Sequence, residues 1–402
     1  MPCIEKFPWL TILGWGEDGI DGLSKTSLAL LQNAEIVFGA KRHIDLLPEL
    51  DARIIEWPVP FSDGIDLLLS ERSKKVVMLA SGDPFWFGAG TVISKRLESS
   101  EWQAIPAPST FNLAASLMGW GLERVKCLGL HAQSLLRIRR YLQPGNKILV
   151  LLRDGNSVSE LQKLLIRFEF DESKLTILES LRGATENIRS LLAKETLPHD
   201  ISQPVVAAIE VFGKGECLPL TPGIPDTFFF NDGQITKCNV RAVTLSALAP
   251  RPGEMLWDIG AGSGSISIEW LLRDERNNAI AFEQNPERVQ RIKHNAMELG
   301  VDWLQVVEGD VLEQLYHHPK PDVVFIGGGL SLKLLNQLRK ILRPGTRIVA
   351  NAVTLESETI LTEYSKNFGG ELLRIEISVP KAIGSMRAWD VAYPIVQWRG
   401  VC

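Results

Sequence analysis

The segment of this chain best suited to bind a nucleotide-like ligand is a glycine-rich turn. Residues 255–270 read MLWDIGAGSGSISIEW: an apolar strand, an acidic residue, three glycines at alternate positions and the start of an apolar helix. Glycine lets the backbone approach a ligand at positions where a Cβ would collide with it. Gly260, Gly262 and Gly264 form G-x-G-x-G, whereas the dinucleotide fingerprint is G-x-G-x-x-G. Asp258 suits the ammonium and sulfonium of S-adenosylmethionine, so the turn predicts a methyltransferase.

The strands expected after this turn end in side chains that suit the same cofactor. Glu283 closes a strand at 278–282, about twenty residues after the glycines, where a carboxylate can accept both ribose hydroxyls. Asp310 follows the next strand and offers an acceptor for the adenine amino group. Residues 327–329, all glycine, and Asn351 follow two later strands. Since the carboxyl ends of parallel strands share one edge of an open sheet, these residues predict a single site.

Three turns in the first half of the chain have a similar placement. Gly14 begins G-W-G-E-D-G after an apolar strand, residues 81–84 read SGDP after the strand at 76–80, and residues 106–111 read PAPSTF. The last of these turns leads into a helix whose cap carries a hydroxyl. The three turns together suggest a second ligand site. Taken singly, each is equally consistent with an ordinary structural turn.

Length and composition indicate a multidomain globular protein. A chain of 402 residues, with 45% hydrophobic and 23% charged residues, is expected to form two or three domains. Short apolar strands alternate with helical stretches in both halves, which favours α/β layers with largely parallel sheets. Residues 212–225 are rich in proline and glycine and predict a linker. We therefore expect domains at 1–211 and 225–402, joined by a linker at 212–224.

The net charge of −5 argues against a nucleic-acid or membrane-surface protein. The five cysteines, Cys3, Cys127, Cys217, Cys238 and Cys402, include no C-x-x-C pair, so neither a disulfide framework nor a structural zinc site is expected. Glu5 and Lys6 precede any apolar stretch, unlike in a signal peptide, and no run is long enough to span a bilayer. We expect a cytoplasmic protein without a bound metal.

The first-half motifs, G-W-G-E-D-G, S-G-D-P-F-W-F-G and P-A-P-S-T-F-N-L-A-A-S-L-M-G-W, resemble the tetrapyrrole (corrin/porphyrin) methylase family, most closely the subgroup that methylates C5 of the corrin precursor. The second half, from P-G-I-P-D-T-F-F-F to N-A-V-T-L-E, resembles the partner family that methylates C15 and decarboxylates. The resemblance covers nearly the whole chain. It implies a two-lobed methylase fold followed by a Rossmann-like class I methyltransferase, and a role in cobalamin biosynthesis.

The resemblance also implies two S-adenosylmethionine sites per chain, a polycarboxylate corrin precursor as substrate and a homo-oligomeric assembly. In the first half, the family's cofactor contacts correspond to Gly14, Gly82, Asp83, Pro84, Ser109 and Thr110. In the second half they correspond to Thr236, Gly260, Ala261, Gly262, Ser263, Gly264, Glu283, Asp310 and Val311, beside Asp258. Glu17 stands where the wider family has a proline, and Leu330 and Ser331 replace small residues after the triple glycine.

Methyl transfer from a sulfonium needs orientation and desolvation more than acid–base groups. Removal of the ring-C acetate carboxyl needs an electron sink, which a nearby hydrogen-bond donor can support. Asn351 and Glu356 are candidates for this role by position, and each could instead be a helix cap or a solvated residue. The substrate carboxylates are expected to meet basic residues. The candidates are Lys41, Arg42 and His43 in the first domain and Lys237, Arg241 and Lys381 in the second.

Two other classes of function remain open from the residues alone. A nicotinamide-dependent oxidoreductase could also use a glycine turn and Glu283, but it is disfavoured by the glycine spacing and by the second, unlike set of turns. A non-catalytic cofactor-binding or RNA-associated scaffold would be expected to show a basic face, which the net charge does not support.

Overall fold

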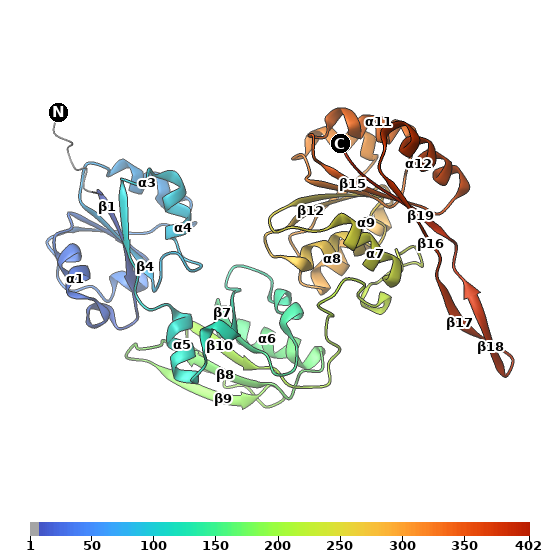
Figure 1. Cartoon of the computed structure of the whole chain (residues 1–402). Coiled ribbons are helices and arrows are strands. Elements are labelled where there is room, and N and C mark those ends of the chain that lie inside the picture. Colours follow the sequence, from blue (N-terminus) through green and yellow to red (C-terminus); the bar gives the residue numbers. More distant parts are fainter. Residues whose placement is uncertain (1–7) are drawn as a thin grey trace, which may run out of the picture. The chain divides into compact units, whose positions relative to one another are not determined.

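The computed structural model describes residues 8–402, so Cys3, Glu5 and Lys6 lie outside the described part of the chain. The contacts divide the molecule into two compact units (Figure 1). The first unit contains the chain up to Leu135 together with Tyr141–Glu216. The second contains Leu136–Arg140 and Cys217–Cys402. Each unit has its own hydrophobic cores.

The first sheet of the first unit is fully parallel, with strand order β3-β2-β4-β1-β5. Its strands are β1 (Leu10–Trp15), β2 (Ile36–Gly39), β3 (Arg53–Glu56), β4 (Val76–Ser81) and β5 (Trp102–Ile105). The intervening helices are η1 (Gly19–Gly22), α1 (Lys25–Gln32), α2 (Lys41–Ile44), α3 (Asp63–Ser70), α4 (Gly90–Ile93) and η2 (Ser94–Arg96). The central strands are buried on both faces and are almost continuously apolar, as a doubly covered parallel sheet requires.

The second sheet of this unit is mixed, with order β6-β7-β10-β8-β9, and only β6 and β7 pair in parallel. Its strands are β6 (Val125–Gly129), β7 (Lys147–Leu152), β8 (Lys174–Glu179), β9 (Asn187–Leu192) and β10 (Val205–Glu210). Its helices are α5 (Thr110–Met118), η3 (Leu122–Arg124) and α6 (Gly155–Arg167). The helix η4 (Leu135–Tyr141) follows β6 in the chain, but its residues Leu136–Arg140 belong to the second unit. The first unit therefore has the two sheets that a two-lobed fold requires.

The second unit contains one seven-stranded sheet with order β13-β12-β11-β14-β15-β19-β16. The strands are β11 (Met255–Ile259), β12 (Asn278–Glu283), β13 (Gln305–Glu308), β14 (Val323–Ile326), β15 (Arg347–Ala352), β16 (Glu371–Ile375) and β19 (Ile395–Val401). The first five are parallel, and β19 pairs antiparallel with both β15 and β16. The helices are η5 (Asp226–Phe228), α7 (Cys238–Leu248), α8 (Ser265–Arg273), α9 (Pro286–Glu298), α10 (Val311–Gln314), η6 (Leu315–His317), α11 (Leu332–Ile341) and α12 (Leu355–Phe368).

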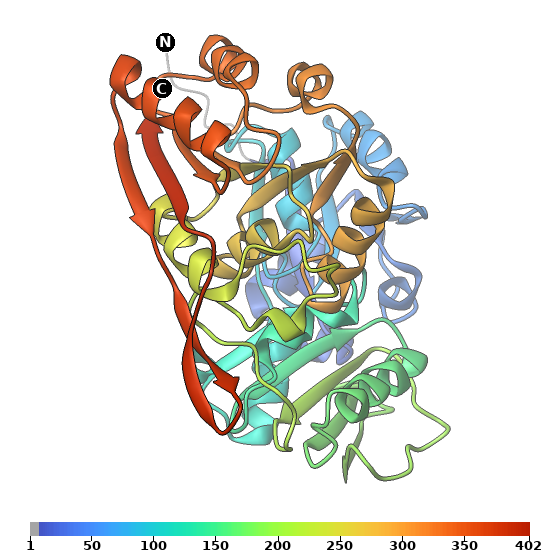
Figure 2. The same cartoon turned by 90° about the vertical axis from the view of Figure 1, so that its right-hand side faces the viewer.

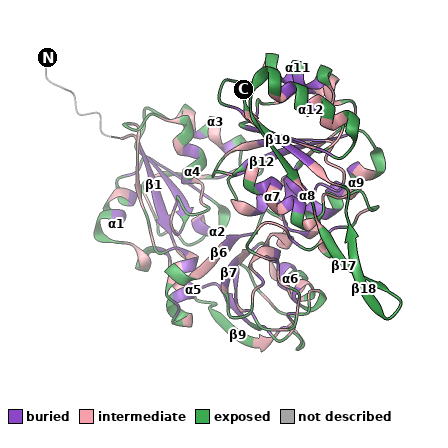
Figure 3. Cartoon of the chain, turned by 45° about the vertical axis from the view of Figure 1, so that its right-hand side comes forward, coloured by how far each residue is buried: buried purple, intermediate pink, exposed green. Residues whose placement is uncertain are grey.

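An antiparallel ribbon, β17 (Ser378–Ile383) and β18 (Met386–Val391), joins β16 to β19. Figures 1 and 2 show this ribbon extending away from the sheet of its unit. Every residue of both strands is exposed, including Met386 and Trp389 at 76% and 72%, and the ribbon stands out in the burial colouring of Figure 3. Two-stranded ribbons are marginally stable on their own in water, so this one is expected to need a partner surface.

These sheets confirm the predicted α/β class with largely parallel strands. In the described chain, no helix combines the length and apolarity needed to cross a membrane. Strands β16 and β19 of the seven-stranded sheet, the ribbon, and strands β3 and β9 of the first unit were not anticipated from the sequence.

Candidate functional site

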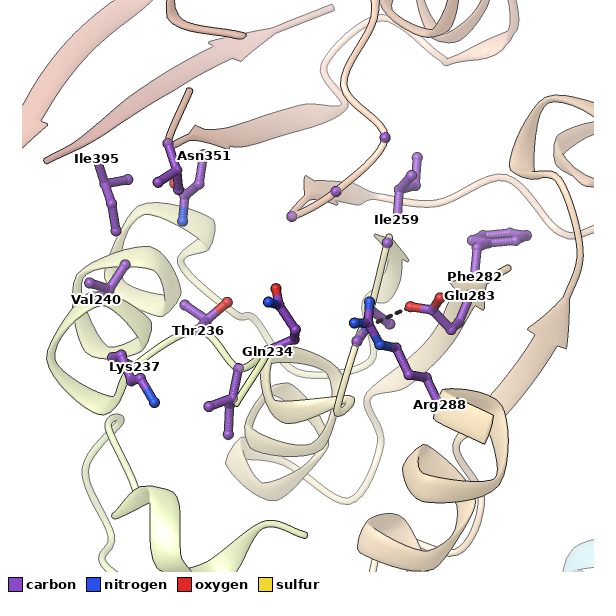
Figure 4. Close-up of a pocket in the computed structure, with 18 of the residues that line it drawn as sticks. Gln234, Thr236, Lys237, Val240, Ile259, Phe282, Glu283, Arg288, Asn351 and Ile395 are labelled. Atoms are coloured by element: carbon purple, nitrogen blue, oxygen red, sulfur yellow. Dashed lines mark hydrogen bonds between the residues drawn. The ribbon is translucent and has the colours of Figure 1, made fainter. Parts of the chain in front are cut away.

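A cavity of about 1040 Å³ opens at the carboxyl edge of the parallel strands in the second unit (Figure 4). The ends of five neighbouring strands contribute to its lining. In spatial order these are Asp310 after β13, Glu283 at the end of β12, Gly260 after β11, Gly327 after β14 and Asn351 in β15. The volume lies at the upper end of the range for small-molecule sites, about 300–1,000 Å³. The cavity therefore has room for a ligand of cofactor size and part of a second one.

The glycine turn after β11 lies against the turn after β14. Gly260 has φ +70°, and a Cβ built on it would lie 2.6 Å from the Cα of Gly328 in the turn after β14. Gly264 has φ +76°, and its Cβ would lie 2.8 Å from the side chain of Ile292. Both left-handed backbone conformations favour glycine. The alternate glycines thus serve the packing of the turn, and Gly260 and Gly262 also line the cavity.

Glu283 is buried and holds the glycine turn to the second strand. One carboxylate oxygen accepts the backbone N–H of Gly262 at 2.8 Å, and the other accepts that of Asn285 at 3.0 Å. Because Glu283 also lines the cavity, it reaches both the turn and any ligand resting on it. The arrangement is suited to a ribose lying across the turn.

Asp258 is buried and does not line the cavity. One carboxylate oxygen accepts the backbone N–H of Ser267 at 3.1 Å and its hydroxyl at 2.5 Å, which ties β11 to α8. The other oxygen has no hydrogen-bond partner. Burial, with a smaller contribution from the charge of Glu283, raises the pKa of Asp258 to about 6.

The expected cofactor residues of this half fall into two groups. The cavity is lined by Thr236, Gly260, Ala261, Gly262, Glu283, Asp310 and Val311, and not by Asp258, Ser263 or Gly264. Sequence reasoning missed an apolar wall made by Val240, Ile375, Ile377, Val379, Tyr393 and Ile395. The alternation of Ile375, Ile377 and Val379 with polar residues was the available signal, because residues two apart in an extended segment point to the same side.

Asn351 lines the cavity, whereas Glu356 does not. The Asn351 amide nitrogen donates to the Thr244 hydroxyl at 2.9 Å, and its oxygen accepts from the Gln397 amide at 3.0 Å. Glu356 lies exposed in the first turn of α12, where a carboxylate favours the helix N-terminus. The expectation that Glu356 lines this mouth is therefore wrong.

The expected basic residues have diverse roles. Arg241 is fully buried, donates to Glu269 at 2.5 Å and to Asp226 at 3.1 Å, and also donates to the carbonyl oxygens of Thr236 and Ile224. It has no surface to offer a substrate, so the expectation of a substrate contact is wrong for Arg241. Lys237 is exposed and lines the cavity with its ammonium 3.8 Å from Asp226.

Two further cations differ in their relation to the cavity. Arg288, which sequence reasoning missed, lines the cavity and pairs with Asp232 at 3.1 Å. In Figure 4 it lies near Glu283, toward the opposite end of the cavity from Asn351 and Ile395. Lys381 pairs with Asp390 on the exposed ribbon and does not line the cavity.

In the first unit, the three expected turns meet at the ends of adjacent strands. A Cβ on Gly14 would lie 2.2 Å from both the carbonyl oxygen of Gly82 and the amide nitrogen of Ala107. Gly82 has φ +54°, and its Cβ would lie 2.9 Å from the Cα of Ser109. The turns after β1, β4 and β5 are therefore in direct contact. They form one edge, as their order in the sheet requires.

Charged and polar side chains gather beside this edge. Arg42 donates to Glu17 and to the Ser81 hydroxyl, the latter at 2.5 Å. His43 is buried with Nε2 3.3 Å from the same hydroxyl, and its Nδ1 has no partner. Burial, with a contribution from Arg42, lowers the pKa of His43 to about 3, so the ring stays neutral near pH 7. His43 therefore cannot supply the positive charge expected of it, whereas Arg42 can. Lys41 pairs instead with Asp45.

The remaining expected residues of this unit form the turns themselves. Asp83 accepts the backbone N–H of Phe85 at 2.8 Å, and Pro84 follows it in the turn. Ser109 is the N-cap of α5: its hydroxyl accepts the N–H of Asn112, whose side chain accepts the N–H of Ser109 in return. Thr110 is the first residue of that helix.

Comparison with known proteins covers both units. Residues 10–195 match the tetrapyrrole (corrin/porphyrin) methylases, and residues 227–401 match the precorrin methyltransferase domain. A Sinorhizobium protein described as precorrin-6Y C(5,15)-methyltransferase (decarboxylating) is 43% identical over 97% of this chain and 96% of its own length.

Shorter relatives match only part of the chain. A Pyrobaculum aerophilum protein described as a probable cobalt-precorrin-6B C(15)-methyltransferase (decarboxylating) is 37% identical over 44% of this chain and 93% of its own. The crystal structure of the C-terminal domain of precorrin-6Y C5,15-methyltransferase from Rhodobacter capsulatus is 48% identical, with a TM-score of 0.45, over 46% of this chain and all of its own. From the full-length relationship, the chain belongs to the precorrin-6Y C5,15-methyltransferase (decarboxylating) family and is a methyltransferase.

Proposed function

We propose that this chain transfers methyl groups from S-adenosylmethionine to a polycarboxylate corrin precursor at two separate sites. The first unit methylates C5; the second methylates C15 and releases the ring-C acetate carboxyl as carbon dioxide, in cobalamin biosynthesis in the cytoplasm. The observation that carries the proposal is the cavity of the second unit, where five strand ends converge on a glycine turn.

The two ends of this cavity suit two different ligands. One end presents Glu283, Asp310 and the backbone of the glycine turn, groups that can bind a ribose and an adenine. The other presents the apolar wall with Asn351 and Lys237, groups that can pack against a macrocycle and meet its carboxylates. A methyl donor and its acceptor could thus be held side by side with water excluded, which is the main requirement of the displacement.

The site proposed for the first unit rests on the contact between its three turns. The backbones of Gly14, Gly82 and Pro108–Ser109 approach too closely for a Cβ on either glycine, so the three turns form one continuous edge at which a ligand can meet main chain from each of them. Arg42 is the cation best placed beside that edge to meet a substrate carboxylate. The match of residues 10–195 to the tetrapyrrole methylases supports this assignment.

The boundaries proposed for the two parts remain 1–211 and 225–402 with a linker between them. The Pyrobaculum relative, which is named for C15 methylation and matches 44% of this chain, supports the view that a single part can carry one reaction. We also propose a homo-oligomer in which the exposed ribbon β17–β18 of one copy packs against that of another.

The two-site proposal can be tested by counting bound cofactor in the full chain. Calorimetric titration with S-adenosylmethionine is expected to give two sites in the wild type and one in either Gly82→Ala or Gly260→Ala, whose Cβ would clash with backbone. Gly119→Ala and Gly253→Ala are matched controls, because both positions have a positive φ but open space for the Cβ. If the wild type bound only one S-adenosylmethionine per chain, one of the two proposed sites would be refuted.

Product analysis assigns the reactions. With the corrin precursor as substrate, Gly260→Ala is expected to yield a product with one added methyl that retains every carboxyl. Carbon dioxide release from this variant at the wild-type rate would show that decarboxylation does not depend on the second site.

A further inference from the structure

A buried polar cluster behind the cavity holds the side chain of Asn351 in one orientation. Asn351 in β15 and Gln397 in β19 are direct cross-strand partners, and Thr244 comes from α7 on the same face. Gln397 and Thr244 are buried, at 2% and 0% exposure. The Gln397 amide nitrogen donates to the Asn351 oxygen at 3.0 Å and to the Thr244 hydroxyl at 3.3 Å. The Asn351 amide nitrogen donates to the same hydroxyl at 2.9 Å.

Thr244 decides which way the two amides face. In the observed arrangement its hydroxyl oxygen accepts an N–H from each amide, and a hydroxyl can accept two hydrogen bonds. If both amides were flipped, two carbonyl oxygens would face this hydroxyl, which has one hydrogen to donate. If only Asn351 were flipped, its N–H would face that of Gln397. The cluster therefore favours the orientation in which Asn351 is a donor.

Asn351 consequently has one N–H to spare. Its nitrogen carries two hydrogens and Thr244 takes one; in the part of the chain that the structure describes, no group accepts the other. Asn351 lines the cavity beside Val240, Val353 and Ile395. Asn351 is thus a neutral donor flanked by apolar side chains, and Lys237 is the cation at this end of the cavity.

We propose that the spare N–H of Asn351, fixed by Gln397 and Thr244, holds the substrate carboxylate that is lost as carbon dioxide. The inference rests on the proposed function. In the step, the bond between the carboxyl carbon and the adjacent methylene breaks, its electron pair enters the conjugated macrocycle, carbon dioxide leaves, and a proton from water completes the new methyl group.

A neutral donor suits this step better than a cation would. A carboxylate must be held so that its bond to the methylene aligns with the macrocycle's π system. A cationic donor would add its Coulomb attraction to the hydrogen bond, and it would stabilise the carboxylate in the ground state against loss. Asn351 orients the group while the apolar wall leaves its charge poorly solvated. Gln397 and Thr244 act through Asn351 and are positioning residues.

The first test measures carbon dioxide released per methyl transferred by the full chain supplied with S-adenosylmethionine and the corrin precursor. Asn351→Asp replaces the donor with a like charge and is expected to lower this ratio at least about 10-fold while methyl transfer by the first site persists. Thr244→Val removes the hydroxyl that sets the amides and should lower the ratio, whereas Thr244→Ser should restore it. A wild-type ratio in folded Asn351→Asp would overturn the proposal.

The second test adds a cation beside the amide. Val353 is exposed and lines the cavity, so Val353→Lys is expected to be tolerated in folding. The lysine should lower KM for the precursor and slow carbon dioxide release. The neutral control Val353→Gln should not combine a lower KM with slower release. Faster release in Val353→Lys than in Val353→Gln would contradict the role of a neutral donor. Absence of any methyl transfer by the wild type would instead refute the proposed function.

Discussion

Arg241 shows at the residue scale how burial changes the role of a charged side chain. Its guanidinium is enclosed by Glu269, Asp226 and two backbone carbonyls, and Glu269 is itself fully buried. Glu269 also accepts the backbone N–H groups of Gly223 and Ile224. The pair therefore fastens the segment before η5 to helices α7 and α8. Charge in a sequence does not reveal burial, which is why Arg241 was expected at the surface.

Replacing Arg241 should affect stability before it affects substrate affinity. Arg241→Met leaves Glu269 buried without its ion-pair partner, a change that costs about 3–5 kcal/mol. We expect the urea midpoint of the second unit to fall accordingly. Lys237→Ala, which alters an exposed lysine one turn away, should leave that midpoint nearly unchanged. A raised KM in Arg241→Met at unchanged stability would restore the substrate role for this residue.

Asp258 should make the stability of the second unit depend on pH. Its pKa of about 6 in the folded chain lies above the ordinary value of 3.8, so the folded state binds the proton more tightly. The resulting stabilisation is present below about pH 4 and is lost as the pH rises to 6. Asp258→Asn keeps an oxygen to accept from Ser267 and removes the charge. In urea titrations, the free energy of unfolding of the variant minus that of the wild type should rise by on the order of 2–3 kcal/mol between pH 4 and pH 7. Parallel pH profiles for the two proteins would contradict this assignment.

At the scale of elements, helix α5 begins at a site expected to contact the cofactor. The Ser109 hydroxyl accepts the backbone N–H of Asn112 and donates its hydrogen to the Asn112 side-chain oxygen, so its only hydrogen is engaged within the helix cap. Ser109→Ala should destabilise the first unit by about 1 kcal/mol. Ser116→Ala, at an exposed position in the same helix, is the control and should have little effect. More than a tenfold loss of cofactor affinity in Ser109→Ala, without loss of stability, would instead favour direct contact.

The elements also show which parts of the fold a sequence reveals. Strands such as β1, β4 and β11 are short apolar runs closed by glycine, and their identity depends on neighbouring residues alone, so they were predictable. Strand β19 pairs with both β15 and β16. In the pairing with β15, the partners Asn351 and Gln397 are 46 positions apart in the sequence. Pairing between residues so far apart cannot be recognised from the residues within a short stretch of sequence. The apolar wall and the polar cluster behind Asn351 both depend on it, and neither was foreseen.

At the scale of the whole molecule, the exposed ribbon is the surface that carries the oligomer prediction. Ile383, Met386 and Trp389 are each more than half exposed, and an apolar ribbon with open edges favours pairing with an identical one. Light scattering on the wild type should give a mass above that of one chain. The double variant Ile383→Lys/Trp389→Lys should have a lower mass in solution and should still bind two cofactor molecules per chain. A monomeric wild type would refute the proposed association.

The interior position of β19 has a consequence for how the protein is made. Strands β15 and β16 have no shared neighbour until residues 395–401 leave the ribosome, so until then each presents an unpaired edge to the cell. At roughly 5–20 residues per second, the interval from β15 to β19 lasts a few seconds. The ten strands described in the first unit, from residue 8 onward, all precede residue 211 and can pair earlier. During synthesis the sheet of the second unit thus keeps unpaired edges until its last strand, β19, is made, and a chaperone that covers such edges would act on this unit until then.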